Sequence, residues 1–323
     1  MSDTAKLALG VDIGGTKVAV GTVDENGKIL THGRKPMIAN GTAEAAFNAV
    51  TDAIDSMLAT SGGTAQSIGI CCPGPLDPKS GVVLNPPNLP CWRNFPLAKR
   101  ISAKYNVPVK VDNDANAAAL AETLWGAAQG YRFVFCATLG TGIGTGIIFD
   151  GVIYHGKTGS AGEGGHVSID YRGPVCNCGK RGCIEILASG PAIGVRARAK
   201  VAADPSRASV LLTLAGGNVT AVTSEKVGQA FAAGDALARE ILLDTIEVLT
   251  PWLGNIVDIL DPDVLVIGGG VASMLQPFFD EIKRRIPAWC VNPRAAEIPL
   301  LMARYGAEAG VAGGAALCYR GRG

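Results

Sequence analysis

Short apolar runs alternate with glycine turns at the start of the chain. Residues 7–13, 18–23 and 28–30 are largely apolar, and a Gly-Gly-Thr turn and an Asn-Gly turn separate them. Asn-Gly between two apolar runs is a strong signal for a hairpin, because both turn residues tolerate positive φ. The pattern predicts three strands joined by two hairpins.

The next hundred residues alternate between helical and strand patterns. Apolar residues recur every three or four positions in the helical segments, whereas the strand segments are short and rich in Val and Ile. Helices are predicted over 43–60, 96–105 and 115–128, and strands over 67–72 and 107–111. The last helix is rich in alanine and begins at Asp112-Asn113-Asp114.

The opening pattern returns 126 residues later, from Leu7 to Phe133. Strands are predicted over 133–139, 145–149 and 152–154, joined by a glycine turn and an Asp-Gly hairpin signal. The recurrence suggests a duplicated α/β half, with a ligand gripped between the copies. Two unrelated meanders remain the alternative explanation.

The rest of the chain is mostly helical. Helical patterns fill most of 185–260, a strand over 263–267 precedes Gly268-Gly269-Gly270, and 307–319 is predicted to be a closing helix. A chain of 323 residues suggests two domains at roughly 150 residues each. We expect a smaller α/β lobe over 1–115 plus the closing helix at about 307–323, and a larger α/β lobe over 116–306.

Composition excludes several classes of protein. Hydrophobic residues make up 48% of the chain and charged residues 18%, which is typical of a folded protein with a large core. The formal net charge is only +1, so no basic field favours nucleic acid. Glycine is in excess, at 43 residues, and its clusters beside apolar strands suggest backbone turned tightly against a ligand.

No segment is expected to cross a membrane. The longest uncharged window, 56–76, holds 21 residues, but Gly, Pro, Ser, Thr and Gln interrupt it. The next two, 133–149 and 208–224, hold 17 residues each, and a span needs about 20 predominantly apolar ones. The start of the chain lacks the pattern of a signal peptide, so we expect a cytoplasmic protein with reduced cysteines. His32 and His155 belong to no motif and are expected at the surface.

Three glycine motifs imitate known nucleotide-binding patterns. The segment from Gly151 to Thr158 matches a P-loop in its letters, but apolar β-branched residues fill the loop and no helix is predicted after it. Gly140–Gly146 precedes a strand rather than a helix, and Ser273 stands where a third glycine would follow Gly268-Gly269-Gly270. A P-loop and a Rossmann site are therefore both disfavoured.

Glycine hairpins can instead hold phosphate through successive backbone N–H groups. Thr16 and Thr141 can add hydroxyl donors to the two hairpins. Asp12 stands at a strand end beside the first hairpin, where it can hold Mg²⁺ directly or through water. A buried structural aspartate is the alternative.

Four residues have the spacing of a zinc site. His166, Cys176, Cys178 and Cys183 follow an H-x₉-C-x-C-x₄-C pattern with glycines in between. Such a set suits tetrahedral Zn²⁺ with no open position, which indicates a structural metal. Reduced cysteines in a glycine-rich loop are the alternative.

Asp114 is the candidate general base. It follows a strand and opens a helix, so its carboxylate is expected at a rigid edge. Aspartate is also common as the N-cap of a helix. The residues alone do not separate these two roles.

Several motifs together resemble the ROK family of sugar kinases and sugar-responsive repressors, within the actin-like ATPase superfamily. Three glycine motifs, in 12–17, 139–144 and 266–271, resemble its phosphate and adenosine motifs. The family-specific motifs are Pro73-Gly-Pro75, Asn113-Asp-Ala-Asn116, Gly162-Glu-Gly-Gly-His166 and Cys176-Asn-Cys-Gly-Lys-Arg-Gly-Cys-Ile-Glu185. The resemblance runs from residue 7 to Gly310.

The resemblance implies a hexokinase-type duplicated fold with two lobes around a cleft. It implies an ATP- and Mg²⁺-dependent hexose kinase that phosphorylates the 6-hydroxyl, most like the family's glucokinases, with glucose as the expected substrate. Other ROK kinases act on fructose, mannose, allose, N-acetylglucosamine or N-acetylmannosamine, and these remain alternatives, as does a sugar sensor that does not bind DNA. A homodimer or homotetramer is expected, with a place in glycolysis.

Residue roles follow from the same resemblance. Asp114 is expected to take the proton of the attacking hydroxyl, and Asn88, Asn113, Glu163, His166 and Glu185 are expected to bind the sugar with it. The nucleotide is expected to contact Asp12, Gly14, Gly15, Thr16, Lys17, Gly140, Thr141, Gly142, Gly268, Gly269 and Gly270. The zinc would fix the loop that carries His166 and Glu185.

The chain departs from the family pattern at three positions. Cys91 stands where glycine is common before a tryptophan, Gly164 where a larger residue is frequent, and Thr145 where glycine is common. Cys91 and Gly164 are expected near the sugar, so they put the preferred hexose in doubt. Family repressors carry a winged helix ahead of this region, for which the predicted first strand near Leu7 leaves no room.

Overall fold

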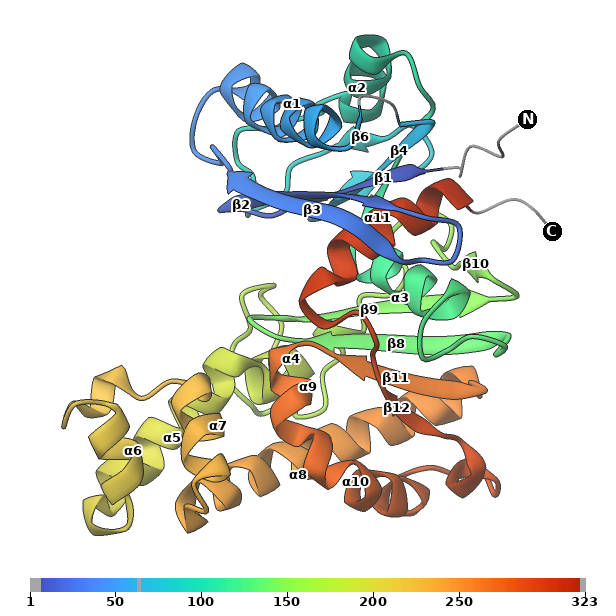
Figure 1. Cartoon of the computed structure of the whole chain (residues 1–323). Coiled ribbons are helices and arrows are strands. Elements are labelled where there is room, and N and C mark those ends of the chain that lie inside the picture. Colours follow the sequence, from blue (N-terminus) through green and yellow to red (C-terminus); the bar gives the residue numbers. More distant parts are fainter. Residues whose placement is uncertain (1–6, 63–64, 320–323) are drawn as a thin grey trace. The chain divides into compact units, whose positions relative to one another are not determined.

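Two five-stranded sheets with the same spatial order of strands form the framework of the chain (Figure 1). A computed structural model describes residues 7–62 and 65–319. The first sheet contains, in order, β3 (Ile29–Pro36), β2 (Lys17–Val23), β1 (Ala8–Ile13), β4 (Ser67–Cys72) and β7 (Val109–Asn113). The second contains β10 (Val152–Ile153), β9 (Ile143–Phe149), β8 (Phe133–Leu139), β11 (Val264–Gly268) and β12 (Leu300–Met302).

The repeated strand order confirms the predicted duplication. In the first sheet β1 pairs with β2 antiparallel, β2 with β3 antiparallel, and β1 with β4 parallel. In the second sheet β8, β9 and β10 take the places of β1, β2 and β3, and β11 and β12 take those of β4 and β7. Each half is therefore a meander followed by parallel strands, which is the mixed α/β architecture that the sequence predicts.

Packing divides the chain into two units. The first comprises Met1–Cys136, Gly146–Gly162 and Arg304–Gly323, and the second Ala137–Thr145 and Glu163–Ala303. The first unit reaches beyond residue 115, where the sequence places a lobe boundary. It does so because α3 (Asp114–Leu124) packs against α11 (Ala309–Tyr319), and this contact joins the Ala-rich helix to the first unit.

Helices cover both faces of the first sheet. Figure 1 shows α1 (Ala43–Thr60) and α2 (Leu97–Tyr105) on one face and α11 on the other. The α11 helix lies directly on the strands, since a Cβ at Gly10 would stand 1.9 Å from the Val311 carbonyl oxygen and one at Gly69 would stand 1.8 Å from that of Gly314. The glycines Gly10 in β1 and Gly69 in β4 thus allow the backbone of α11 to pack directly against these strands. A small hairpin, β5 (Leu76–Asp77) and β6 (Val82–Val83), completes this unit.

The second unit surrounds its strands with helices. These are α4 (Ile184–Ala188), α5 (Gly190–Ala203), α6 (Ser209–Leu214), α7 (Ser224–Ala232), α8 (Ala236–Leu260), α9 (Gly270–Leu275) and α10 (Phe279–Arg285). The longest, α8, is capped by the Asp235 side chain and buries a continuous apolar stripe. Among the described residues, no helix is both long enough and apolar enough to span a bilayer.

Predicted and observed elements differ mainly at their ends. The helix expected over 43–60 is α1, and the strand expected over 67–72 is β4. The helix expected to run to residue 128 ends at Leu124, because the Glu122 carboxylate accepts a hydrogen bond from the Ala127 N–H (2.8 Å) and turns the chain there. A side-chain contact of this kind has no periodic signal in the sequence.

Candidate functional site

The first glycine hairpin joins β1 to β2 at the end of the central strand. The Gly14 N–H donates to the Lys17 carbonyl oxygen (2.9 Å), which closes the turn and leaves Thr16 and Lys17 exposed. Asp12 is the last but one residue of β1 and stands beside the start of α11. A Cβ at Gly310 would lie 2.3 Å from the Asp12 Cγ, so the helix approaches this carboxyl closely only because residue 310 is glycine.

The electrostatics of Asp12 link it to the candidate base. Burial raises the pKa of Asp12 from 3.8 to about 6, and the negative charge of Asp114 adds to the rise while Lys17 opposes it. Two carboxylates that repel each other in one unit form a region that attracts a divalent cation. The Mg²⁺ role predicted for Asp12 stays a prediction, and the nearby Asp114 carboxylate is compatible with it.

Three consecutive polar residues at the end of β7 have different environments. The Asn113 side chain is the N-cap of α3 and accepts hydrogen bonds from the Ala115 and Asn116 N–H groups (2.9 and 3.4 Å). Asp114 is the first helical residue and is exposed, with one carboxylate oxygen accepting from the Ala115 N–H (2.8 Å). The capping role considered for Asp114 thus belongs to Asn113, and the Asp114 carboxylate faces solvent at the positive end of a helix.

The third of these residues, Asp112, is buried and fully occupied. It accepts hydrogen bonds from the Asn113 N–H (2.8 Å), the Asn116 amide (3.2 Å) and His155 Nε2 (2.7 Å). The expectation that His155 lies at the surface is therefore wrong, since its side chain is only 21% exposed. Sequence reasoning missed this pair because its members are 43 residues apart and belong to no motif.

Asn88 lies beside the first hairpin. A Cβ at Gly15 would stand 3.0 Å from the Asn88 carbonyl oxygen, so the two segments touch through their backbones. The neighbouring Trp92 is fully buried and stacks on Phe95, with ring centroids 4.9 Å apart. Cys91 is half-buried beside them, and burial raises the pKa of its thiol.

The second glycine hairpin joins β8 to β9 and opens onto a large cavity. Its turn closes through the Gly140 N–H and the Gly142 carbonyl oxygen (2.9 Å), and the Gly140 carbonyl oxygen accepts from the Gly190 N–H at the start of α5 (2.8 Å). The cavity has a volume of about 1090 Å³ and lies wholly within the second unit. Gly140, Thr141 and Gly270 line it, so the structure joins the second hairpin to the Gly268–Gly270 motif.

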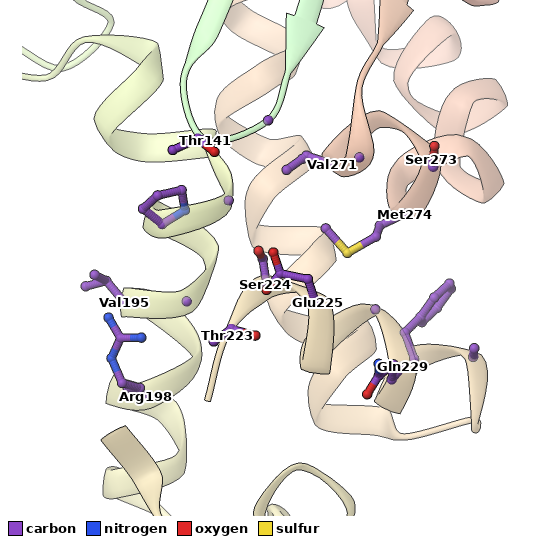
Figure 2. A pocket seen from close by; sticks show the side chains of 18 of the residues that line it. Thr141, Val195, Arg198, Thr223, Ser224, Glu225, Gln229, Val271, Ser273 and Met274 are labelled. Carbon is purple, nitrogen blue, oxygen red and sulfur yellow. The ribbon is translucent and has the colours of Figure 1, made fainter. Parts of the chain in front are cut away.

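The other walls of this cavity come from three helices (Figure 2). Val195 and Arg198 project from α5, Gln229 from α7 and Met274 from α9. The Arg198 guanidinium donates to the Val222 carbonyl oxygen (2.8 Å), which fixes it at the rim. A deep, mainly apolar cavity with a few polar groups suits an aromatic base with an attached sugar. These helical residues could not be predicted from the sequence because they belong to no motif.

Gly269 has a geometric requirement of its own. Its φ is +92°, a conformation that favours glycine, and a Cβ there would stand 2.3 Å from the Leu139 carbonyl oxygen. The end of β11 therefore packs directly on the residue that precedes the second hairpin. This contact brings two of the predicted nucleotide motifs together.

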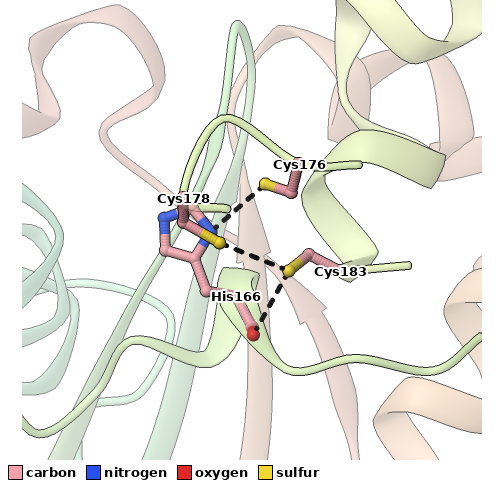
Figure 3. A group of neighbouring side chains, drawn as sticks. All are labelled: His166, Cys176, Cys178 and Cys183. Atoms are coloured by element: carbon pink, nitrogen blue, oxygen red, sulfur yellow. Dashed lines mark hydrogen bonds between the residues drawn. The ribbon is translucent and has the colours of Figure 1, made fainter. Parts of the chain in front are cut away.

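The four predicted metal ligands converge on one point (Figure 3). Their ligand atoms all lie within 4.8 Å of one another; Cys178 and Cys183 Sγ are 3.6 Å apart, and Cys176 Sγ is 3.7 Å from His166 Nδ1. Zn–S bonds of about 2.3 Å and Zn–N bonds of about 2.0–2.1 Å at tetrahedral angles place neighbouring ligand atoms about 3.5–3.8 Å apart. The donor set and its spacing therefore fit Zn²⁺.

Glu185 connects this cluster to the second hairpin. One carboxylate oxygen accepts from the Ile143 N–H (2.9 Å), and the other lies 3.9 Å from His166 Nδ1. Glu163 is exposed at the start of the 3₁₀ turn Gly164–His166. Glu163, His166 and Glu185 thus belong to the second unit, whereas Asn88, Asn113 and Asp114 belong to the first.

The segment that imitates a P-loop has a different structure. The strand β10 begins directly after Gly151, the first glycine of the pattern, and turns follow it instead of a helix. The segment lacks the helix N-terminus that a P-loop uses to bind phosphate.

Comparison with known proteins identifies the relatives of this chain. A model of the ROK family matches residues 8–320. The chain belongs to the ROK family. Its fold is accordingly the duplicated α/β fold of the actin-like ATPases and hexokinases, as expected from the sequence.

Several of the similar curated proteins are named as sugar kinases. The chain is 35% identical to a glucokinase from Streptomyces coelicolor over 316 residues, which cover 96% of this chain and 97% of that protein. It is 32% identical to an N-acetylmannosamine kinase from Shigella boydii, over 96% of this chain and 97% of the relative. A solved ROK family glucokinase from Streptomyces griseus, in complex with glucose and AMPPNP, matches with a TM-score of 0.85 and 35% identity, covering 98% of this chain and 100% of the other.

Proposed function

We propose that the protein is an ATP- and Mg²⁺-dependent hexose kinase that converts glucose to glucose 6-phosphate. One observation carries the proposal: the Asp114 carboxylate is exposed at the first position of α3 while Asn113 supplies the helix cap. Asp114 is therefore not the cap residue of the helix, which favours the general-base role that the family resemblance implies. The similarity to glucokinases over nearly the whole chain supports the same substrate.

In the proposed reaction, Asp114 takes the proton of the sugar 6-hydroxyl as its oxygen attacks the γ-phosphorus of ATP. The bond from that phosphorus to the β–γ bridging oxygen breaks, and ADP leaves. Phosphoryl transfer depends mainly on alignment and charge neutralisation, with a carboxylate accepting the attacking hydroxyl's proton.

Nucleotide binding would use both glycine hairpins. The Gly14 and Gly140 N–H groups close the two hairpins, and the other N–H groups of the hairpins, such as those of Gly15, Thr16 and Thr141, would donate to phosphate oxygens. Asp12 would hold Mg²⁺, which neutralises phosphate charge. The adenosine would occupy the cavity beside Gly268–Gly270. Its volume of about 1090 Å³ accommodates a nucleoside, and its largely apolar walls suit a purine.

Sugar recognition would use amides and carboxylates, because a hexose presents paired hydroxyls that both donate and accept. Asn113 would contribute its amide nitrogen, since its oxygen caps α3. Asn88, Glu163, His166 and Glu185 would complete the set. Zn²⁺ held through His166 Nδ1 and three cysteines would fix the imidazole ring of His166. The Nε2 atom of this ring would then face a hydroxyl group of the sugar.

The proposal extends to the setting of the enzyme. We place it in the cytoplasm, in glycolysis, as a homodimer or homotetramer that binds no nucleic acid, on the basis of its composition and family. Another hexose is the principal alternative substrate, because the chain is also 32% identical to an N-acetylmannosamine kinase. A sugar sensor without kinase activity is the other alternative.

A coupled assay of ADP release across a hexose panel tests the proposal. We expect the highest kcat/KM with glucose, and no release of ADP when the sugar is left out. A higher kcat/KM with N-acetylmannosamine would make that sugar the substrate instead of glucose. ADP release that does not depend on sugar would refute hexokinase activity.

Replacement of the base tests the mechanism. Asp114→Asn keeps the shape of the side chain but removes its basicity, so we expect kcat to fall about 10²- to 10⁴-fold. Zinc content should remain that of the parent, and the melting temperature should not fall, because the change removes a negative charge that repels Asp12. Asp280→Asn, which changes an exposed aspartate in the first turn of α10, is the matched control and should keep full activity. Parent-like kcat in Asp114→Asn would exclude this residue as the base.

A further inference from the structure

The turn Glu163–His166 carries two of the residues proposed to bind sugar, and strand β9 holds it in place. The Gly164 N–H donates to Thr145 Oγ1 (2.8 Å), and the Gly164 carbonyl oxygen accepts from the buried Trp252 indole N–H (3.1 Å). All these residues lie in the second unit. The peptide groups on both sides of residue 164 are thereby fixed by side chains, and these also set the positions of Glu163 and His166.

Space, and not backbone conformation, requires glycine at residue 164. Gly164 is absent from the glycines with positive φ in the described residues, so its backbone suits any amino acid. A Cβ there would nevertheless stand 2.7 Å from Thr145 Oγ1, 3.2 Å from Cγ2 and 3.4 Å from Cβ. The threonine side chain occupies the space that a side chain at residue 164 would need.

Thr145 cannot easily yield this space. It is only 4% exposed, and its branched Cβ restricts rotation about χ1. A rotation would exchange the hydroxyl and the methyl group, both of which lie near residue 164, and the Cβ would stay within contact distance. The obstruction is therefore a property of the threonine and would disappear with glycine at residue 145.

Two departures from the family pattern thus meet in one contact. By the resemblance described above, glycine is expected at residue 145 and a larger side chain at residue 164, where this chain has Thr145 and Gly164. We propose that Thr145 is a positioning residue for the sugar-binding turn. In this proposal Thr145 and Gly164 form a matched pair, because the threonine side chain fits only when residue 164 lacks a side chain. The inference rests on the proposed sugar site. It implies that Gly164 does not enlarge the sugar pocket, since Thr145 fills the vacated volume from the strand side.

The same stretch of β9 also positions Glu185. The Ile143 N–H donates to Glu185 Oε2 (2.9 Å), two residues before Thr145. The first three residues of β9 thus position three of the residues proposed to bind sugar. Ile143 holds Glu185 directly, and Thr145 holds the turn that bears Glu163 and His166. A disturbance at Thr145 should therefore change hexose affinity and leave the nucleotide cavity unchanged.

A reciprocal exchange tests the pair. The variants are Gly164→Ala, Thr145→Gly and the double variant, each assayed for the KM of glucose, the KM of ATP and kcat. Gly164→Ala should raise the KM of glucose at least about tenfold through the overlap with Thr145, with the KM of ATP changed less than about twofold; contacting residues commonly couple by about 2- to 100-fold. The double variant should recover to the level of Thr145→Gly.

Conservative variants separate the hydroxyl from the volume. Thr145→Ser keeps the hydrogen-bond acceptor and should keep the KM of glucose within about threefold of the parent. Thr145→Val keeps the shape but offers the Gly164 N–H no acceptor, so its KM for glucose should rise severalfold. Neither variant adds volume, so both remain informative if Gly164→Ala does not fold.

Gly165→Ala is the matched control. A Cβ there would stand 1.8 Å from the Ile143 carbonyl oxygen, which no change at residue 145 removes, so Thr145→Gly should not rescue it. A double variant Thr145→Gly/Gly164→Ala as impaired as Gly164→Ala, or rescue of Gly165→Ala by Thr145→Gly, would overturn the pairing. If the parent phosphorylates no hexose, the proposed function fails but the pairing of Thr145 with Gly164 is still tested. Rescue of Gly164→Ala by Thr145→Gly is then measured as recovery of the melting temperature.

Discussion

At the scale of single residues, two aspartates that are close in the sequence lie in opposite environments, one buried and one exposed to solvent. Asp112 is 4% exposed and accepts three hydrogen bonds, whereas Asp114, two residues on, is exposed. The difference arises where β7 ends and α3 begins, because the change from strand to helix turns successive side chains toward the core, the helix end and solvent. The candidate base is therefore selected by its position in this transition.

Asp12 provides a prediction on pH. Its pKa is raised from 3.8 to about 6 by burial and by Asp114, so between these values the folded protein binds a proton that the unfolded chain does not. Its contribution to stability is complete below pH 3.8 and is lost as the pH rises through about 6. At pH 7.5 the ionised, metal-free carboxylate costs up to about 3 kcal/mol.

We therefore expect Asp12→Asn to melt at a higher temperature than the parent at pH 7.5 in buffer without Mg²⁺. The gain should shrink toward pH 4, and kinase activity should fall because Mg²⁺ loses a ligand. Thermal melts across pH check this expectation, with Asp280→Asn as the control. A lower melting temperature for Asp12→Asn at pH 7.5 would show that the charged form is stabilised in the fold.

At the scale of elements, the loop from His166 to Cys183 has little core of its own. Tyr171 is 75% exposed and Val175 is 55% exposed, so burial of apolar side chains contributes little to its order. Its fixed points are the four candidate ligands and short backbone pairings such as Ser168 with Cys183. A metal would therefore supply most of the energy that orders this loop.

Removal of the metal tests this element. We expect one zinc per chain in the purified protein, and chelation should lower the melting temperature and raise the KM of glucose at least about tenfold, with recovery on added Zn²⁺. Cys176→Ser should behave like the chelated protein. Cys290→Ser, in a half-buried cysteine outside the cluster, is the matched control. Zinc-free protein with a parent-like KM would exclude this supporting role.

At the scale of the whole molecule, the ends of the sequence meet in one unit. Residues 311–317 of α11 are buried, and the helix packs on β1 and β4 at backbone distance. The first unit thus cannot complete its core until the last twenty residues of the chain are present. The second unit, by contrast, ends at Ala303.

Truncation after Ala303 should therefore damage one unit and spare the other. We expect the shortened chain to lose kinase activity and the near-ultraviolet circular dichroism of the first unit, because β1 and β4 lose the helix that covers one face. Zinc should still bind at one ion per chain, since all four ligands precede residue 304. A shortened chain with parent-like melting and activity would contradict the assigned role of α11.

Much of the architecture could be predicted from local patterns. The hairpin signals, the helix over 43–60 and the recurrence from Leu7 to Phe133 depend on turn chemistry and periodicity, which act over a few residues. The spacing of His166 and the cysteines indicated a metal site for the same reason, because a metal draws its ligands from one short loop. The end of α3 and the partner of His155 escaped prediction, since both depend on single side chains from distant segments.

The sequence by itself therefore determined the duplicated α/β plan, the two glycine hairpins and the four residues of the candidate metal cluster. Tertiary structure alone decided that Asn113 caps the helix, that Asp112 is paired with His155, and that Thr145 and Gly164 share one space. The physical reason is range: turn and helix preferences act between neighbours in the chain, whereas steric exclusion and hydrogen bonding act between neighbours in space. Residues 19 apart, such as Thr145 and Gly164, constrain each other only after the strand and the turn have come together.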